Sequence, residues 1–274
     1  MHDPSRMPTL FLPHGGGPWP FVDVGFGDPD EWARLATYLR GIGRFRPRAM
    51  LVVSAHWEAA VATVTTHPSP PLLYDYSSFP PEAYRLTWPS PGDVTLARRV
   101  RALLDVAGLP SAEDPQRGFD HGTFVPLKLS HPRADVPTVQ LSLLRGLDPE
   151  HHLAMGRALR PLRDEGVLIV GSGMSYHDMR GFGSARGRDA SLAFDAWLQP
   201  TVTAAPSERE ARLRRWQDAP GARLCHPREE HLLPLMVVAG AAGDDVGTVP
   251  YADSVLGVRI TAAHFGDVTA PVAT

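Results

Sequence analysis

Five of the chain's twelve histidines lie in short motifs rich in glycine, serine or acidic residues: His14, His56, His121, His177 and His231. Histidine is the commonest metal ligand in proteins and the commonest acid or base near neutral pH. Loops held by a rigid sheet are also where catalytic groups concentrate. The pattern therefore predicts a mononuclear metal site with acid–base groups beside it.

Three of these histidines follow predicted strands: His14 follows residues 9–13, His56 follows residues 49–54 and His177 follows residues 167–171. Ligands of open α/β sheets bind beyond the carboxyl ends of the strands. One such histidine is easily an incidental turn residue. Three strand ends that each deliver one are hard to explain by chance packing, so we expect the three side chains to converge.

His231 is predicted in the first turn of an apolar helix, directly after Glu229 and Glu230. Negative charge suits a helix N-terminus, which is a structural explanation for the two glutamates. A protonated His231 would gain nothing from that position. A neutral, metal-bound imidazole explains His231 better.

Asp120 and His121 stand next to each other before an apolar stretch. A carboxylate beside an imidazole can orient the ring as an acid or a base. Alternatively, Asp120 caps the start of a helix. The residues alone leave both readings open.

Short apolar runs alternate with longer helical patterns, which predicts an α/β fold with a mixed, mainly parallel central sheet flanked by helices. The predicted strands are 9–13, 49–54, 61–66, 138–143, 167–171 and 255–261, and the predicted helices are 30–40, 93–107, 149–165, 190–201, 208–217 and 228–239. Residues 67–91 are proline-rich and aromatic with little periodicity. Long loops in compact domains are usually functional or disordered, and the aromatic content favours an ordered loop over the open end of the sheet.

Composition narrows the functional class. The net charge of −3 gives no reason to expect a nucleic-acid partner. The single cysteine, Cys225, excludes an intrachain disulfide and a thiolate-rich zinc site. No signal peptide and no apolar run of about 20 residues is found, so we expect a cytoplasmic protein without a membrane partner.

The chain resembles the class III extradiol ring-cleavage dioxygenases, the LigB-like superfamily, and within it the DOPA-dioxygenase-type branch. The resemblance is carried by motifs in family order along nearly the whole chain: 13–18, 54–57, 74–76, 79–80, Tyr84, 118–122, 139–142, 171–173 with His177, and 230–235. It implies one α/β domain over residues 1–274. It also implies an enzyme that inserts both atoms of O2 into a catechol and cleaves the ring beside the hydroxyls.

The resemblance also assigns roles to the histidines. His14, His56 and His231 match the metal-binding positions, His177 matches the acid–base histidine, and His121 matches a second histidine of the pocket. Trp57, Tyr74 and Phe79 are expected in the substrate pocket.

The identity of the metal and of the last ligand stays open at this point. Members of the superfamily that cleave protocatechuate use two histidines and a glutamate, whereas here the third position is His231 with Glu230 beside it, and His177 is a possible fourth ligand. Fe(II) is expected for activity, with a catechol and O2 as substrates. Three imidazoles also suit Zn(II), which we expect to compete for the site in purified protein.

Two other functions compete with ring cleavage. A zinc hydrolase would use metal-bound hydroxide, but the sequence has no His-Glu-x-x-His pattern. A Memo-like protein of the same superfamily would act as a non-enzymatic metal-binding or protein-interaction module, because a fold does not fix a function.

Overall fold

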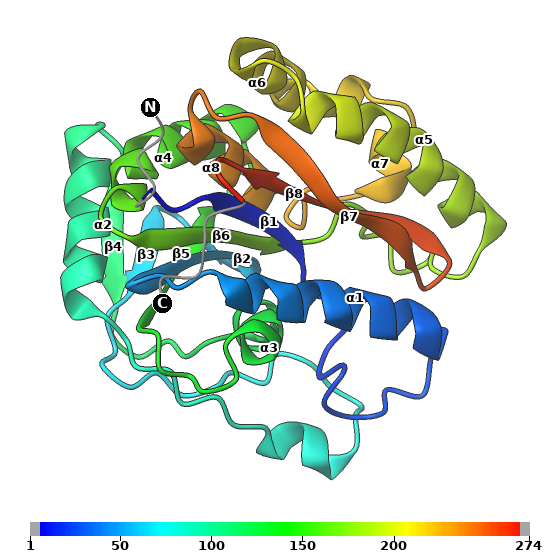
Figure 1. The fold of residues 1–274 in the computed structure, drawn as a ribbon, viewed down its shortest axis with the longest axis horizontal. Coiled ribbons are helices and arrows are strands. Elements are labelled where there is room, and N and C mark those ends of the chain that lie inside the picture. Colours follow the sequence, from blue (N-terminus) through cyan, green and yellow to red (C-terminus); the bar gives the residue numbers. More distant parts are fainter. Residues whose placement is uncertain (1–5, 269–274) are drawn as a thin grey trace.

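One mixed sheet of eight strands runs through the part of the chain that this computed structural model describes, residues 6–268 (Figure 1). The strands are β1 (Thr9–Pro13), β2 (Ala49–Ala59), β3 (Ala62–Thr65), β4 (Ser111–Asp114), β5 (Thr138–Leu144), β6 (Val167–Gly173), β7 (Gly247–Val255) and β8 (Val258–Phe265). They lie in the order β4-β3-β5-β2-β6-β1-β8-β7. The predicted α/β class is confirmed, while the outermost ends of the predicted domain, 1–5 and 269–274, lie outside the described residues.

The four central strands β5, β2, β6 and β1 are parallel to one another. Their residues are almost all buried, as expected for a parallel sheet covered on both faces. Antiparallel pairing occurs toward the two edges, where β3 joins β5 and where β8 joins β1 and β7.

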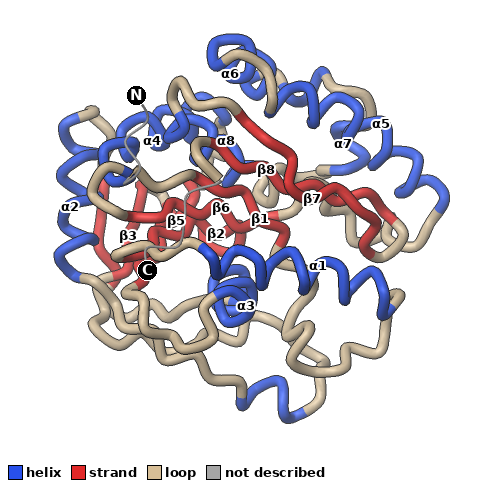
Figure 2. Tube along the Cα trace, in the orientation of Figure 1, coloured by secondary structure: helices blue, strands red, loops and turns tan. Residues whose placement is uncertain are grey.

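Helices cover both faces of the sheet. They are α1 (Pro29–Gly41), α2 (Val94–Val106), α3 (His121–Ser130), α4 (Pro149–Leu159), α5 (Ala185–Val202), α6 (Pro206–Arg214), α7 (Ala222–Cys225) and α8 (Leu233–Ala242), with 3-10 turns at Ile42–Arg44, Pro81–Arg85, Arg160–Arg163 and Trp216–Asp218. Helices α1 and α3 lie on one face, and α4 and α8 lie on the other (Figure 1). The long connection between β3 and α2 runs on the side of α1 and α3, as loop apart from the short 3-10 turn Pro81–Arg85 (Figure 2).

Several predicted boundaries were wrong for identifiable reasons. The strand predicted at 255–261 is in fact a hairpin, in which β7 and β8 meet at a turn with positive φ at Leu256 and Gly257. The helix predicted from residue 228 begins only at Leu233, because Pro234 occupies the start of the helix, where its missing N–H costs nothing. The short polar edge strand β4 gave no pattern that predicted it.

Two further details bear on the site. Strand β2 continues past its predicted end at residue 54 to Ala59, so His56 lies inside the last part of the strand rather than after it. Asp120 caps α3 by accepting a hydrogen bond from the Thr123 amide, which confirms the structural reading of Asp120. Within residues 6–268 no helix is both long and apolar enough to cross a membrane.

Candidate metal centre

His14 follows the carboxyl end of β1 and is almost completely buried. Its Nδ1 lies 3.1 Å from the Ser172 hydroxyl, and that hydroxyl donates to the Gly122 carbonyl. Because the serine proton is used by Gly122, the serine oxygen must accept from Nδ1–H of His14. The Nε2 atom of His14 therefore carries a lone pair and faces the other histidines.

Asp75 contacts both His56 and His121. We call these two histidines, held by one carboxylate, the Asp75 pair. Its Oδ1 accepts from both the backbone N–H and Nδ1 of His121, at 2.9 and 2.8 Å, and its Oδ2 lies 3.5 Å from Nδ1 of His56. His56 comes from β2 and His121 is the first residue of α3. The loop before α2 therefore supplies the carboxylate that orients two histidines from two other elements.

Glu230 connects His177 and His231 in a similar way, which we call the Glu230 pair. Its Oε1 lies 2.9 Å from Nδ1 of His231 and 3.3 Å from Nδ1 of His177. The two rings are stacked with centroids 3.3 Å apart. His177 follows the end of β6 and His231 precedes the start of α8, so the pair lies between these two elements.

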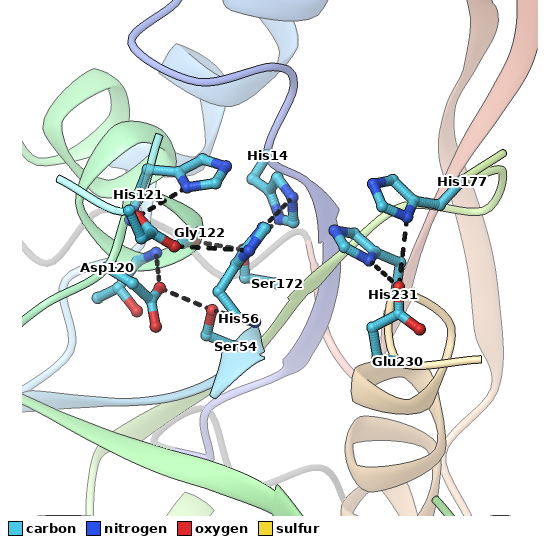
Figure 3. A network of polar contacts seen from close by, with 12 residues as sticks. His14, Ser54, His56, Asp120, His121, Gly122, Ser172, His177, Glu230 and His231 are labelled. Carbon is cyan, nitrogen blue, oxygen red and sulfur yellow. Dashed lines mark hydrogen bonds and ion pairs between the residues drawn. The ribbon is translucent and has the colours of Figure 1, made fainter. Parts of the chain in front are cut away.

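All five histidines predicted from the sequence converge on one place. Figure 3 shows His14 in the middle, with His56 and His121 on one side and His177 and His231 on the other. The ring centroids of the three predicted ligands are 4.9 Å (His14 to His56), 5.2 Å (His14 to His231) and 4.9 Å (His56 to His231) apart. The neighbouring strands β1, β2 and β6 position His14, His56 and His177, while His121 begins α3 and His231 precedes α8.

Burial keeps the three predicted ligands neutral. It lowers the pKa of His14 and His231 well below the usual 6.5, with further lowering from the neighbouring histidines. It lowers the pKa of His56 to about 3. Burial alone would raise the pKa of Asp75, but hydrogen bonds and charge from His121 and charge from His56 hold it at about 2. The centre thus combines neutral imidazoles with an ionised carboxylate at neutral pH.

The described side chains form two groups that could hold a metal ion, namely His14 with His56 and His121, and His177 with Glu230 and His231. Nε2 of His14 lies 3.1 Å from Nε2 of His56, close to the roughly 3 Å that separates two nitrogens bound to one zinc or similar ion. If both rings carry their proton on Nδ1, two lone pairs face each other, which requires a cation between them. Nε2 of His231 is buried without a hydrogen-bond partner in the described chain. Buried polar atoms are rarely left unpaired, so these atoms point to an ion.

The centre opens into a cavity of about 270 Å³. The cavity is lined by the five histidines, by Gly15–Gly17 and by a set of apolar side chains. We call this apolar set the apolar wall; it consists of Phe26, Trp32, Phe79, Met174, Met179, Phe182, Val255 and Leu256. Tyr76 also lines the cavity, but its hydroxyl is engaged with the Ala83 carbonyl. The volume and the lining of the cavity suit a small, largely apolar ligand.

Of the three predicted pocket residues, Phe79 lines the cavity and the other two do not. The Tyr74 hydroxyl is directed to the Leu86 carbonyl within its own loop. Trp57 is buried beneath the Arg117 guanidinium, which stacks 4.5 Å above its ring. The structure thus does not place Tyr74 or Trp57 on this cavity. For Trp57 the reason is that it follows His56 in strand β2, where successive side chains point to opposite faces.

Two features of the centre were not predicted from the residues. Asp75 lies 46 positions from His121, and its only signal was a carboxylate within an aromatic loop. Gly173, at the end of β6, allows His231 to approach, since a Cβ there would lie 2.1 Å from the His231 carbonyl oxygen. Its role depends on a contact between distant segments, which no local pattern reveals.

A family model described as the catalytic LigB subunit of aromatic ring-opening dioxygenase matches residues 9–269 of the chain. The chain is 39% identical to "Dioxygenase tasH" of Hapsidospora irregularis, with 94% of this chain and 85% of the relative covered. It is 38% identical to "4,5-DOPA dioxygenase extradiol" of Beta vulgaris, with 86% and 87% covered.

A bacterial protein of the same name, from Escherichia coli K12, is 35% identical over 90% of this chain and 89% of its own. Among solved structures, an uncharacterized protein from Escherichia coli K12 superposes with a TM-score of 0.77 at 31% identity. The superposition covers 95% of this chain and all of that one.

Proposed function

Since the chain belongs to the LigB family of aromatic ring-opening dioxygenases, we propose that it is an extradiol dioxygenase that cleaves a catecholic ring with O2. The observation that carries this proposal is the 3.1 Å approach of Nε2 of His14 to Nε2 of His56, together with the buried Nε2 of His231 that has no hydrogen-bond partner in the described chain. We assign His14, His56 and His231 as ligands of one mononuclear non-haem metal, and a catechol and O2 as its substrates. Nδ1 of each ring is within reach of Ser172, Asp75 or Glu230, which leaves Nε2 of each ring for the metal.

Fe(II) held by His14, His56 and His231 would supply the redox chemistry that ring cleavage with O2 needs, whereas Zn(II) has no redox chemistry. The same donors also suit zinc, and zinc outranks iron in the usual order of divalent affinities. Zinc in a purified sample would therefore be compatible with the proposal.

His177 is proposed as the acid–base residue. Its Nδ1 faces Glu230, which holds the ring and leaves Nε2 for a substrate in the cavity that His177 lines. At Nε2, His177 can take the proton of a catechol hydroxyl and return a proton later in the reaction. A positioned base of this kind contributes about 10²–10⁴-fold to a rate.

His121 is proposed to bind and orient the substrate. Its Nδ1–H donates to Asp75, so Nε2 is an acceptor on the cavity side. It can accept a hydrogen bond from the second catechol hydroxyl and share the proton transfer with His177. Phe79 and Tyr76 cover the aromatic ring and exclude water from the metal.

The competing functions receive less support. The relatives named above are called dioxygenases, so a Memo-like interaction module is not favoured. A hydrolase would need a general base beside metal-bound water, whereas both carboxylates at this centre are engaged with histidine Nδ1 atoms.

The decisive experiment is reconstitution of the apoprotein with Fe(II) under nitrogen, followed by air and a panel of catechols that includes DOPA and protocatechuate. We expect consumption of O2 and a yellow ring-fission product. A zinc-loaded sample of the same apoprotein is the control and should form none. Failure of the Fe(II) form on the whole panel would contradict the proposal.

A further inference from the structure

The apolar wall of the cavity contains no charged side chain. Among residues 6–268, those that line the cavity include neither Asp, Glu, Lys nor Arg. The nearby carboxylates Asp75 and Glu230 lie behind the histidines and do not line it. A charged group placed against this wall would lose its hydration without gaining a partner, which is strongly unfavourable.

The polar atoms of the wall are already engaged. The Trp32 indole N–H donates to the Phe26 carbonyl at 3.0 Å, and the Tyr76 hydroxyl donates to the Ala83 carbonyl at 2.7 Å. Apart from the histidines, no lining side chain among the described residues keeps a free N–H or O–H group. The wall thus offers shape and apolar contact, and few hydrogen bonds.

The mouth of the cavity is apolar too. Met179 is 72% exposed and Phe26 is 45% exposed, which is unusual for such large side chains. The charged neighbours of Met179 in the sequence, Asp178 and Arg180, line a separate depression. An apolar surface therefore continues from the buried wall at Val255 and Trp32 to solvent.

From this surface we propose that the enzyme takes catechols with an uncharged, apolar substituent, and discriminates against catechols whose substituent is an amino acid, a carboxylate or an amine. The inference rests on the proposed function, because it assumes that the catechol hydroxyls point to the histidines. The substituent then lies along the apolar wall toward Met179 and Phe26. Hydrophobic contact favours it there, while a zwitterion such as that of DOPA has no charged partner among the lining side chains.

The test compares ligands of matched length on the zinc-loaded protein, which can bind a catechol without cleaving it. The probes are 4-propylcatechol, dihydrocaffeate, dopamine and DOPA, and calorimetry gives each dissociation constant. We expect 4-propylcatechol to bind about 10-fold to 100-fold more tightly than the three charged ligands. Tighter binding of dihydrocaffeate would overturn the proposal and assign an anion site to the Gly15–Gly17 amides.

Tighter binding of dopamine would also overturn it, in favour of an aromatic cage for ammonium groups. Binding of none of the four would show that the cavity is not the catechol site. Cleavage by the Fe(II) form distinguishes a failure of the proposed function from a failure of the proposed ligand class. If propylcatechol binds best and no catechol is cleaved, the proposed function fails and the ligand class stands. If DOPA is cleaved with a higher kcat/KM than propylcatechol, the function stands and the ligand class is wrong.

A charge introduced at the mouth provides a second, independent measurement. Met179→Arg places a guanidinium on the apolar surface at an exposed position that should tolerate it. We expect the ratio of affinities for dihydrocaffeate and propylcatechol to rise about 10-fold. Val106→Arg is the matched control, since Val106 is 89% exposed at the end of α2 and lines no part of the cavity. An equal change in both variants, or in neither, would contradict the assigned path of the substituent.

Discussion

The Asp75 pair and the Glu230 pair each consist of two histidines held by one carboxylate, but the carboxylate oxygens are used differently in the two pairs. In each, one carboxylate holds a proposed metal ligand and a proposed substrate-facing histidine. Asp75 divides this work between its oxygens, with Oδ1 on His121 and Oδ2 on His56. Glu230 uses Oε1 for both His177 and His231. The two pairs should therefore respond differently to the same chemical change.

The pairs also differ in how the chain assembles them. Glu230 is adjacent to His231 in the sequence, and Arg228 lies 3.4 Å from its second oxygen. Asp75 must be brought from a long loop to the start of α3, where it also accepts the backbone N–H of His121. One half of the centre is thus built locally, while the other depends on the docking of the loop.

Removal of a proposed metal ligand should have the largest effect on metal content and activity, and the losses should be equal in the two pairs. We expect His56→Ala and His231→Ala each to lose the metal and all detectable ring cleavage, because each removes one of three donors. Metal content after dialysis, measured by elemental analysis, checks this. His151→Ala, at an exposed histidine of α4, is the control and should keep its metal. Retention of a full equivalent by either ligand variant would exclude that histidine from the metal.

Removal of the substrate-facing histidines should have the second largest effect, and this effect should differ between the two pairs. We expect His177→Ala to keep the metal and to lose about 10²–10⁴-fold in kcat, the usual contribution of a positioned acid or base. His121→Ala should lose less and should raise KM, because we assign it to substrate binding. Steady-state kinetics with parallel metal analysis measures both. If His177→Ala loses the metal instead, His177 is a ligand and its assigned role is wrong.

Neutral amides in place of the carboxylates should give a smaller and unequal effect. In Asp75→Asn one oxygen can stay with the two N–H groups of His121, so the amide NH2 must face His56, and we expect a loss of about 10–100-fold in metal affinity. In Glu230→Gln a single amide oxygen can still accept from both histidines, so the loss should be smaller.

Competition with a chelator measures these affinities. The matched control is Glu229→Gln, since Glu229 pairs with Arg223 and contacts neither His177 nor His231. Its metal affinity should be unchanged. A larger loss for Glu230→Gln than for Asp75→Asn would reverse the comparison.

The smallest effect that we expect is in the number of protons released when the metal binds, and the ligands of both pairs should contribute little to it. The lowered pKa values of His14, His56 and His231 mean that all three rings are already neutral in the apoprotein at pH 6. An unperturbed histidine would be largely protonated there and would release its proton on binding. We therefore expect well under one proton released per metal at pH 6, measured by calorimetry in buffers of different ionisation enthalpy. Release of one or more protons would show that a ligand is charged in the apoprotein.

The sequence predicted the convergence of the histidines because strand ends are a local signal. His14, His56 and His177 each follow a run of apolar, β-branched residues, and parallel neighbours in a sheet end at the same edge. The residues that orient these histidine rings could not be predicted from the sequence. The partner of His121 is Asp75 rather than the adjacent Asp120, which caps α3 and is buried under Ser54 and Gln140.

The apolar wall could not be predicted from the sequence either. Val255 and Leu256 reach the cavity from the turn of the β7–β8 hairpin. That hairpin was missed because β7 is an edge strand that contains Pro250 and begins at Gly247, both of which are depleted in strand interiors. Phe26 and Trp32 belong to the segment around the start of α1, where an apolar residue is normally read as core.

The place of β1 in the sheet has a consequence for the biogenesis of the protein. Strand β1 is the first to leave the ribosome, yet its two neighbours, β6 and β8, are among the last. His14 therefore cannot reach His231 until nearly the whole chain has been synthesised. On the proposed assignment, the three ligands can therefore hold one ion together only after His231 has been synthesised and β1 has paired with β6.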